Sequence, residues 1–230
     1  MNCFRTFIVA VLVIADLFAP LSDAQAGMVL SQLVVELAPG QLSRADVEVF
    51  NDGSERIFVA ADPREVIDAG TMAQSSRTDV DPEKLGLLVS PDRMVLEPGQ
   101  HKLLRIATFG TSDRERVYRV TVKPVVGQLS SQRSGLKLLV GYDVLVLVRP
   151  VEVRPHVSGT RSGDQLTLKN DGNVSVELVD GRECEASTKV CEVLPDGRLY
   201  MGAERVITVR SNHRVEYKLA VGGKSIPVDF

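Results

Sequence analysis

Short runs in which every second residue is apolar recur along the chain from residue 28 onward, with turn residues between them. Side chains alternate between the two faces of a β-strand, so this period of two predicts strands with one buried face. In the first part of the chain the predicted strands cover residues 28–37, 42–50, 56–67, 86–90, 93–96, 101–109, 116–124 and 136–148. Helical periodicity is hard to find after residue 27, so the sequence predicts an all-β protein.

Turn and loop residues divide these strands. Asn51, Asp52 and Gly53 tolerate a positive φ and predict a tight turn. Pro63 lacks a backbone donor, so the strand over 56–67 is expected to break or bend there. Residues 68–84 are polar and have no period, which predicts a long connection between two sheets. This succession of short strands and turns is typical of an immunoglobulin-like β-sandwich.

A second and smaller set of short strands follows Arg149 and Pro150, because proline cannot continue a central strand. The strands predicted there cover residues 164–170, 174–181, 197–209, 214–223 and 225–230. The sequence therefore predicts two immunoglobulin-like β-sandwich domains, at residues 27–149 and 150–230, joined by a short hinge.

Residues 1–26 have the pattern of a cleaved secretory signal peptide. Arg5 precedes an apolar run over residues 7–15, and the small-residue pattern Ala24-Gln25-Ala26 comes before Gly27. No later apolar run approaches the length that a membrane helix requires, so we expect an exported protein without membrane insertion.

The mature chain contains two cysteines, Cys184 and Cys191. In an oxidising compartment such a pair usually forms a disulfide, and this is the prediction here. The alternative, a redox-active or metal-bound pair, needs a shorter spacing or further ligands. The formal net charge of −3, with both signs mixed along the chain, argues against binding to nucleic acid.

Residue patterns that would indicate an enzyme are missing from the sequence. His101, His156 and His213 lie in separate segments without a carboxylate or cysteine at ligand spacing, so we interpret them as surface residues. The Asp-Val-Asp at 79–81 lacks the glycine and terminal glutamate of a calcium loop. No nucleophile elbow or phosphate-binding glycine loop occurs, so we predict a non-enzyme without catalytic residues, metal or cofactor.

The most informative element is the strand predicted over residues 136–148, which is twice the usual length. Val144, Val146 and Val148 are expected to fill the core of the first domain. Residues 136–140 follow the polar segment 127–135, so they would present an apolar edge to solvent. Exposed apolar edges promote aggregation unless they are used, which predicts that a partner adds its strand there.

Three segments in this order resemble the periplasmic chaperones of the chaperone–usher pilus pathway, the PapD-like family. They are "SPDRMVLEPGQHKLLRI" (90–106), "DRERVYRVTV" (113–122) and "LKLLVGYDVLVLVRP" (136–150). The resemblance covers the first domain well and the second only in size and strand content.

The resemblance implies a function and a set of residues. The protein would consist of two domains that meet at an angle. In the periplasm it would donate a strand to an incomplete pilin subunit, the client, and it would then deliver the client to an outer-membrane usher. The client-binding positions fall on Leu136, Leu138, Val140 and Tyr142, and Arg149 with Pro150 falls on the domain junction. The free chain would also be expected to self-associate to cover the exposed strand.

One departure from the family concerns the client's terminal carboxylate. Typical members bind it with an arginine and a lysine at positions that hold Val34 and Leu145 here. We therefore expect a different anchor, for which Lys123 and Lys137 are candidates.

Two rival functions remain open at this stage. A structural pilus subunit or secreted adhesin would use the same domain type, but the segment before the first strand is too short for a donor extension. An exported hydrolase would need catalytic groups that the sequence does not reveal.

Overall fold

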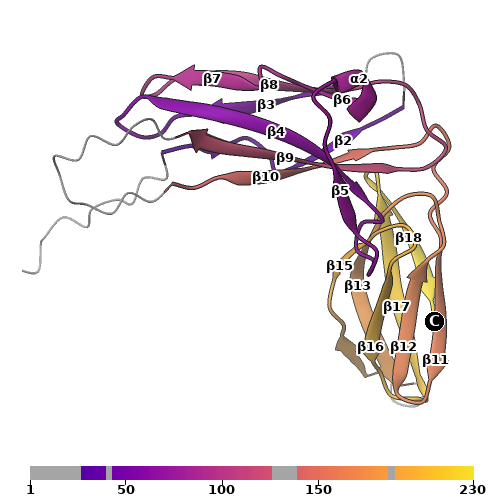
Figure 1. The fold of residues 1–230 in the computed structure, drawn as a ribbon. Helices are drawn as coiled ribbons and strands as arrows, with labels where there is room; N and C mark the ends of the chain where they lie inside the picture. The colour runs from indigo at the N-terminus through magenta and orange to yellow at the C-terminus, as the bar shows by residue number, and fades with distance from the viewer. Residues whose placement is uncertain (1–26, 40–42, 126–138, 186–189) are drawn as a thin grey trace, which may run out of the picture.

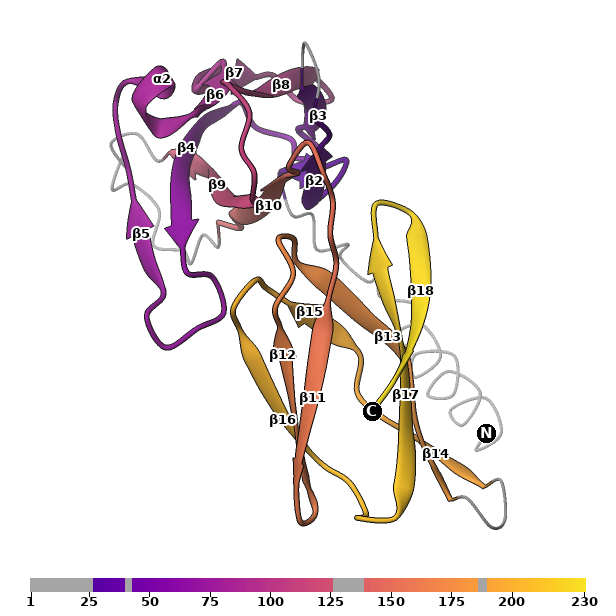
Figure 2. The same ribbon diagram turned by 90° about the vertical axis from the view of Figure 1, so that its right-hand side faces the viewer.

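The computed structural model describes residues 27–39, 43–125, 139–185 and 190–230, which form two β-sandwiches arranged as a bent molecule (Figures 1 and 2). The described part contains a single short helix, α2 (Pro82–Leu85), and no helix in it is long and apolar enough to cross a membrane. The predicted all-β class is confirmed. The signal peptide predicted over residues 1–26 lies outside the described residues.

The first sandwich packs a four-stranded sheet on a six-stranded sheet. The four-stranded sheet has the order β1 (Val29–Leu30), β3 (Arg44–Phe50), β8 (His101–Thr108), β6 (Leu87–Ser90). The six-stranded sheet has the order β2 (Val34–Leu37), β10 (Tyr142–Val148), β9 (Arg116–Val125), β4 (Ile57–Ile67), β5 (Ser75–Arg77), and β7 (Arg93–Leu96) also pairs with β4.

Side-chain alternation fills the core between these sheets. Val144, Val146 and Val148 of β10 point inward and are buried, as the sequence pattern predicted. Leu145 and Leu147, which alternate with them, belong to a separate apolar cluster on the outer face of the six-stranded sheet. Both faces of β10 are therefore apolar near its end.

One strand predicted for the first sandwich is wrong in detail. The apolar run over 28–37 is divided between β1 and β2, which lie in different sheets. Pro63 does not break β4, which continues from Ile57 to Ile67. The amide of Ala61 donates toward the β7 side, to the Asp92 carbonyl, so the missing amide of Pro63 faces the gap between β7 and β5, where β4 has no partner strand in the described residues.

The second sandwich packs a three-stranded sheet on a five-stranded sheet. The first has the order β11 (Val157–Ser162), β12 (Gln165–Asn170), β16 (Glu204–Thr208). The second has the order β14 (Cys191–Val193), β13 (Val176–Glu185), β17 (His213–Val221), β18 (Lys224–Asp229), and β15 (Gly197–Leu199) also pairs with β13. The predicted disulfide between Cys184 and Cys191 is confirmed and links β13 to β14.

The two sandwiches contain the same asparagine turn. In the first, the Asn51 amide donates to the carbonyls of Glu55 and Leu96 and its oxygen accepts from Gly53. In the second, Asn170 makes the equivalent bonds to Val174, Leu199 and Gly172. Each asparagine is fully buried and joins a tight turn to a strand of the same sandwich.

Replacing Asn170 with alanine is expected to lower the free energy of unfolding by about 1–3 kcal/mol, because two buried carbonyls lose their donors. Urea unfolding monitored by far-UV circular dichroism measures the change. The exposed neighbour provides a matched control, since Asp171→Ala removes a side chain of similar size that does not enter the core. Equal losses in the two variants would contradict this role for Asn170.

Candidate functional site

The edge of β10 is covered by a neighbouring strand over only part of its length. On one side β9 pairs with all of Tyr142–Val148, whereas on the other side β2 pairs with Leu145–Val148 alone. Within the described ranges, residues 142–144 have no strand on that second side. Of these three residues, Asp143 directs its backbone groups to this side, as Leu145 does in donating to the Leu33 carbonyl, so the Asp143 amide is available to a strand from another chain.

The exposed apolar residues expected before this edge are described only in part. Leu136, Lys137 and Leu138 lie outside the described residues. Leu139 and Val140 come next and are 44% and 43% exposed. Tyr142 is half-buried against the core of its own sandwich, and its hydroxyl donates to the Met28 carbonyl at 2.9 Å. Of the predicted client-binding residues, the structure thus leaves Val140 accessible and packs Tyr142 inward.

Val34 and Leu145 lie directly opposite each other on the paired strands β2 and β10. Val34 is 45% exposed and Leu145 is 5% exposed. Neither side chain can bind a carboxylate, so this pair of positions does not supply an anchor for one.

Lys123, a predicted anchor, lies beside the exposed segment. A Cβ placed on Gly141 would lie 3.2 Å from the Cβ of Lys123. The Lys123 ammonium is 3.1 Å from the Asp62 carboxylate, which also pairs with Arg93. Burial raises the pKa of Asp62, but the hydrogen bond from Lys123 and the charge of Arg93 outweigh this effect. The pKa of Asp62 is therefore below its usual value, and its carboxylate is ionised at neutral pH.

The sequence did not reveal a second basic group on the outer face of the six-stranded sheet. Arg64 of β4 and Arg119 of β9 are directly opposite each other, and both lie near Asp143 of β10. Arg64 Nη2 is 2.8 Å from Asp143 Oδ2, and Arg119 Nε is 3.9 Å from the same oxygen. Thr121 completes the group, since its hydroxyl donates to Asp143 and accepts from Arg64.

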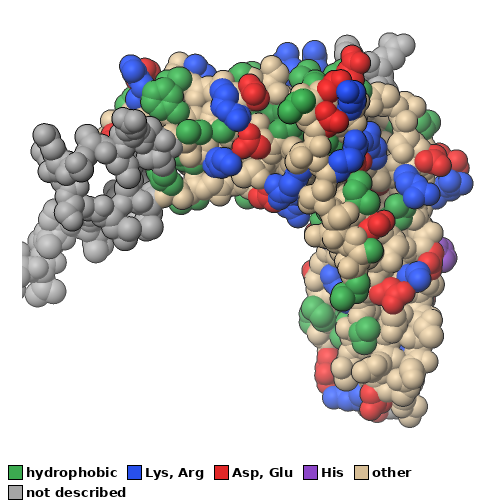
Figure 3. Space-filling model, in the orientation of Figure 1, with side chains coloured by type: hydrophobic (Ala, Val, Ile, Leu, Met, Phe, Trp, Pro, Cys, Tyr) green, Lys and Arg blue, Asp and Glu red, His purple; other side chains and the backbone are tan. Residues whose placement is uncertain are grey.

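A hollow of about 300 Å³ lies beside this basic group, close to the second sandwich. Its charged lining residues are Arg64, Arg119 and Asp143, and Tyr200 of the second sandwich forms another part of the wall. Basic side chains are visible where the two sandwiches meet (Figure 3). The hollow therefore has a net positive lining between the domains.

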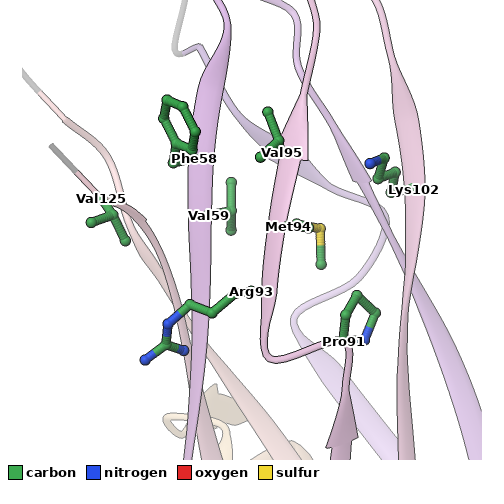
Figure 4. Close-up of a pocket in the computed structure, with 8 residues that line it drawn as sticks. All are labelled: Phe58, Val59, Pro91, Arg93, Met94, Val95, Lys102 and Val125. Atoms are coloured by element: carbon green, nitrogen blue, oxygen red, sulfur yellow. The ribbon is translucent and has the colours of Figure 1, made fainter. Parts of the chain in front are cut away.

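The far end of the same face is apolar. Phe58, Val95 and Val125 are cross-strand neighbours with exposures of 50%, 37% and 45%. They contribute to a hollow of about 660 Å³ that also contacts Arg93 and Lys102 (Figure 4). Hydrophobic side chains are accordingly exposed at the end of the first sandwich away from the second (Figure 3).

Arg149 lies at the junction between the sandwiches. Its guanidinium forms ion pairs with Glu115 and with Glu36, the latter at 2.8 Å, and donates to the Ser175 carbonyl of the second sandwich at 3.2 Å. Pro150 follows and is buried. Burial raises the pKa of Glu115, and this effect is larger than the lowering caused by the charge of Arg149 and the hydrogen bonds from Ser175. The pKa of Glu115 is therefore above its usual value. The junction is a buried ionic network that includes groups from both sandwiches.

An apolar contact supports the same junction. Tyr200 packs against the outer-face cluster formed by Ala69, Val117, Leu145 and Leu147. The hairpin between β4 and β5 extends toward the second sandwich (Figure 2). Gly70 in this hairpin has a φ of +74°, and a Cβ there would lie 3.0 Å from the Tyr200 ring. The close approach thus requires a glycine.

The interpretation of His213 as a surface residue is wrong. The side chain of His213 is only 12% exposed, and its Nδ1 lies 3.1 Å from a Glu183 carboxylate oxygen. The sequence could not reveal this pair because Glu183 lies on a different strand, β13. Among the described residues, no three or more His, Cys, Asp or Glu side chains are grouped so that they could hold a metal ion.

Residues 27–154 match the family model described as "Pili and flagellar-assembly chaperone, PapD N-terminal domain". The chain belongs to this family. The resemblance identified from the three sequence segments is therefore confirmed, and the family is one of assembly chaperones.

Curated relatives of this PapD-like chain include two fimbrial proteins of Escherichia coli, one named for CFA/I fimbriae and one for CS1 fimbriae. The CFA/I protein is 24% identical over 149 residues, and that match covers 61% of this chain and 62% of the relative. The CS1 protein is 23% identical over 150 residues, which cover 62% of this chain and 63% of the relative. The chain thus spans less than two thirds of the curated relatives it matches.

Solved structures of similar fold include the class 5 fimbriae chaperone CfaA, with a TM-score of 0.71 and 22% identity, covering 88% of this chain and 97% of that one. Another is the Salmonella enterica SafA pilin in complex with the SafB chaperone, with a TM-score of 0.59 and 18% identity, covering 91% and 98%. These similarities support two immunoglobulin-like sandwiches as the fold of the whole described chain.

Proposed function

We propose that this PapD-like protein is a periplasmic chaperone that donates a β-strand to an incomplete pilin subunit. The observation that carries the proposal is the uncovered edge of β10 at residues 142–144, which continues into the exposed residues Leu139 and Val140. Leu136 and Leu138 have the same parity as Val140 and Val144, so they would extend the inward-facing row into the client's core. Such a function requires no catalytic residue, metal or cofactor.

The strand supplies affinity in two ways. Ladder hydrogen bonds join the backbones of chaperone and client, and alternate side chains fill the client's core. Burying each of Leu136, Leu138 and Val140 contributes about 1.5–3 kcal/mol. The client would remain bound until another subunit replaces the donated strand.

The client's terminal carboxylate is assigned to basic groups on the outer face of the six-stranded sheet. Lys123 and Lys137 are the anchors that the sequence suggested. Arg64 and Arg119 are better suited, because a guanidinium binds a carboxylate through two hydrogen bonds and the hollow beside them gives access between the domains. Arg149 and Pro150 hold the junction and do not contact the client.

The proposal includes further partners and a location. An outer-membrane usher would receive the client complex, and the apolar residues Phe58, Val95 and Val125 form a separate surface on which such a partner can dock. The client-free chain would self-associate through the exposed strand. The signal peptide at residues 1–26 would direct the chain to the periplasm.

The alternative function, a structural pilus subunit or secreted adhesin, is not favoured. The matched family consists of assembly chaperones.

Replacing Leu138 with aspartate is expected to abolish co-purification of the pilin client, because a charge would enter the client's core. Co-expression in the periplasm, followed by affinity purification of the chaperone, measures this loss. Val206→Asp is the matched control, since it places the same charge at an exposed position of β16 in the second sandwich, away from the uncovered edge. Undiminished co-purification with a folded Leu138→Asp chaperone would refute strand donation through this residue.

A further inference from the structure

The carboxylate of Asp143 occupies the basic group that faces the hollow between the domains. It accepts hydrogen bonds from Arg64 at 2.8 Å and from Thr121 at 3.0 Å, while Arg119 donates to the Asp143 backbone carbonyl at 3.3 Å. A carboxylate supplied by this chain thus already lies where a carboxylate ligand would bind.

The charges in this group do not balance. The lining of the hollow contains two cations, Arg64 and Arg119, and one anion, Asp143. Arg119 Nε is 3.9 Å from the nearest Asp143 carboxylate oxygen, beyond hydrogen-bonding distance. The group can therefore accept a second carboxylate, or exchange the one it holds for a ligand that reaches both guanidinium groups.

The partial exposure of these three side chains lowers the free-energy cost of exchanging one carboxylate for another. The side chains of Arg64 and Asp143 are 32% and 42% exposed, and that of Arg119 is 34% exposed. Ion pairs in this range of exposure contribute little to stability, because water competes for both charges. A released Asp143 side chain can turn into water, because the hollow is open to solvent.

Asp143 is also directly linked to the uncovered edge. It is a residue of β10, three positions after the exposed Val140, and it lies within the stretch 142–144 that β2 does not cover. A chain that pairs with this edge would therefore pass beside the Asp143 backbone. Pairing and carboxylate exchange would occur at neighbouring positions.

We propose that the Asp143 side chain is an internal carboxylate that pairs with Arg64 beside Arg119 in the client-free protein, and that the client's terminal carboxylate displaces it from Arg64. This inference rests on the proposed chaperone function and adds a regulatory contact to it. Asp143 keeps the two guanidinium groups oriented before the client arrives and weakens the binding of any competing anion. The same competition lowers the affinity for the client carboxylate, which favours later release.

The test measures carboxylate binding to the full mature chain without a client. Sodium acetate is the probe and neutral acetamide is its control, with ionic strength held constant because salt screens these charges. The readout is the Nε–H resonance of Arg119 in nitrogen-15 spectra, assigned with the Arg119→Lys variant. Acetate, and not acetamide, is expected to shift this resonance, and Arg64→Met is expected to abolish the shift.

Replacing Asp143 with asparagine is expected to tighten acetate binding about fivefold or more, the coupling that competition between two ligands of one site produces. Asp62→Asn is the matched control, since it removes another carboxylate from the same face that pairs with Lys123 and Arg93. It is expected to leave the acetate affinity unchanged. The proposal is overturned if Asp143→Asn does not bind more tightly, or if Asp62→Asn produces an equal gain.

Two further results separate this inference from the proposed function. If Asp143 only stabilises the sheet, Asp143→Asn will lower the melting temperature without changing acetate affinity, which overturns the inference alone. Strand donation is tested independently by co-purification of the Leu138→Asp variant, which does not depend on the carboxylate site.

Discussion

Replacing Arg149 with methionine is expected to lower the free energy of unfolding by about 3–5 kcal/mol, because the Glu115 carboxylate then remains buried without its cation. The Glu115 side chain is only 1% exposed, and the variant also removes the bonds from Arg149 to Glu36 and to the Ser175 carbonyl. Chemical unfolding measures the loss. Small-angle scattering should show a wider distribution of domain arrangements, since Ser175 belongs to the second sandwich.

Two controls test this account: the pH dependence of the stability of the Arg149→Met variant, and a double variant that also replaces Glu115. Burial already raises the pKa of Glu115 above its ordinary value of 4.5, and loss of Arg149 will raise it further. The folded variant then binds a proton more tightly than the unfolded chain, so its stability increases as pH falls toward that raised pKa. Adding Glu115→Gln should restore part of the stability at pH 7. A loss that is independent of both pH and Glu115 would contradict this account.

The second large effect is expected at Glu65, which joins three elements of the first sandwich. Its carboxylate pairs with Arg116 of β9 at 2.8 Å and with Arg77 of β5 at 2.5 Å, and both arginines also donate to the Leu85 carbonyl at the end of α2. Replacing Glu65 with glutamine should lower the free energy of unfolding by about 2–3 kcal/mol, somewhat below the usual cost of breaking a buried pair because Arg77 is partly exposed.

The sign of the pH dependence is opposite to that of Glu115. Burial raises the pKa of Glu65, but the hydrogen bonds from Arg116 and Arg77 outweigh it and hold that pKa below its usual value of 4.5. The stability that Glu65 contributes is thus present above pH 4.5 and lost as pH falls through the lowered folded pKa. The difference between the parent protein and Glu65→Gln, measured by chemical unfolding, should therefore narrow in acid. A constant difference between pH 7 and pH 3 would exclude this mechanism.

The alternation of apolar residues was sufficient to predict most strands of the fold. It failed where one apolar run serves two sheets, as in residues 28–37, because the break depends on which sheet each half can join. It also missed β11, whose sequence Val-Ser-Gly-Thr-Arg-Ser has one buried residue at its start and little apolar pattern. That strand is positioned by its pairing with β12, which a local pattern does not contain.

The sequence could predict only the part of the candidate site whose residues are consecutive in the chain. The apolar row before Gly141 is continuous in sequence, so the pattern indicated it directly. The basic group of Arg64, Arg119 and Asp143 comes from three strands, β4, β9 and β10, that become neighbours through sheet pairing. No local spacing connects these residues, which is why the sequence suggested Lys123 and Lys137 instead.

The course of β10 has a mechanical consequence. The strand runs from its uncovered edge at Tyr142 to Val148, immediately before Arg149, and seven residue pairs join it to β9 along this length. A tensile load applied to residue 139 along the strand axis would act on all of these hydrogen bonds in shear rather than one after another. The load would then reach the guanidinium of Arg149, which connects the two sandwiches. A force on the open end of β10 should therefore be resisted both by the hydrogen bonds to β9 and by the contacts at the domain junction.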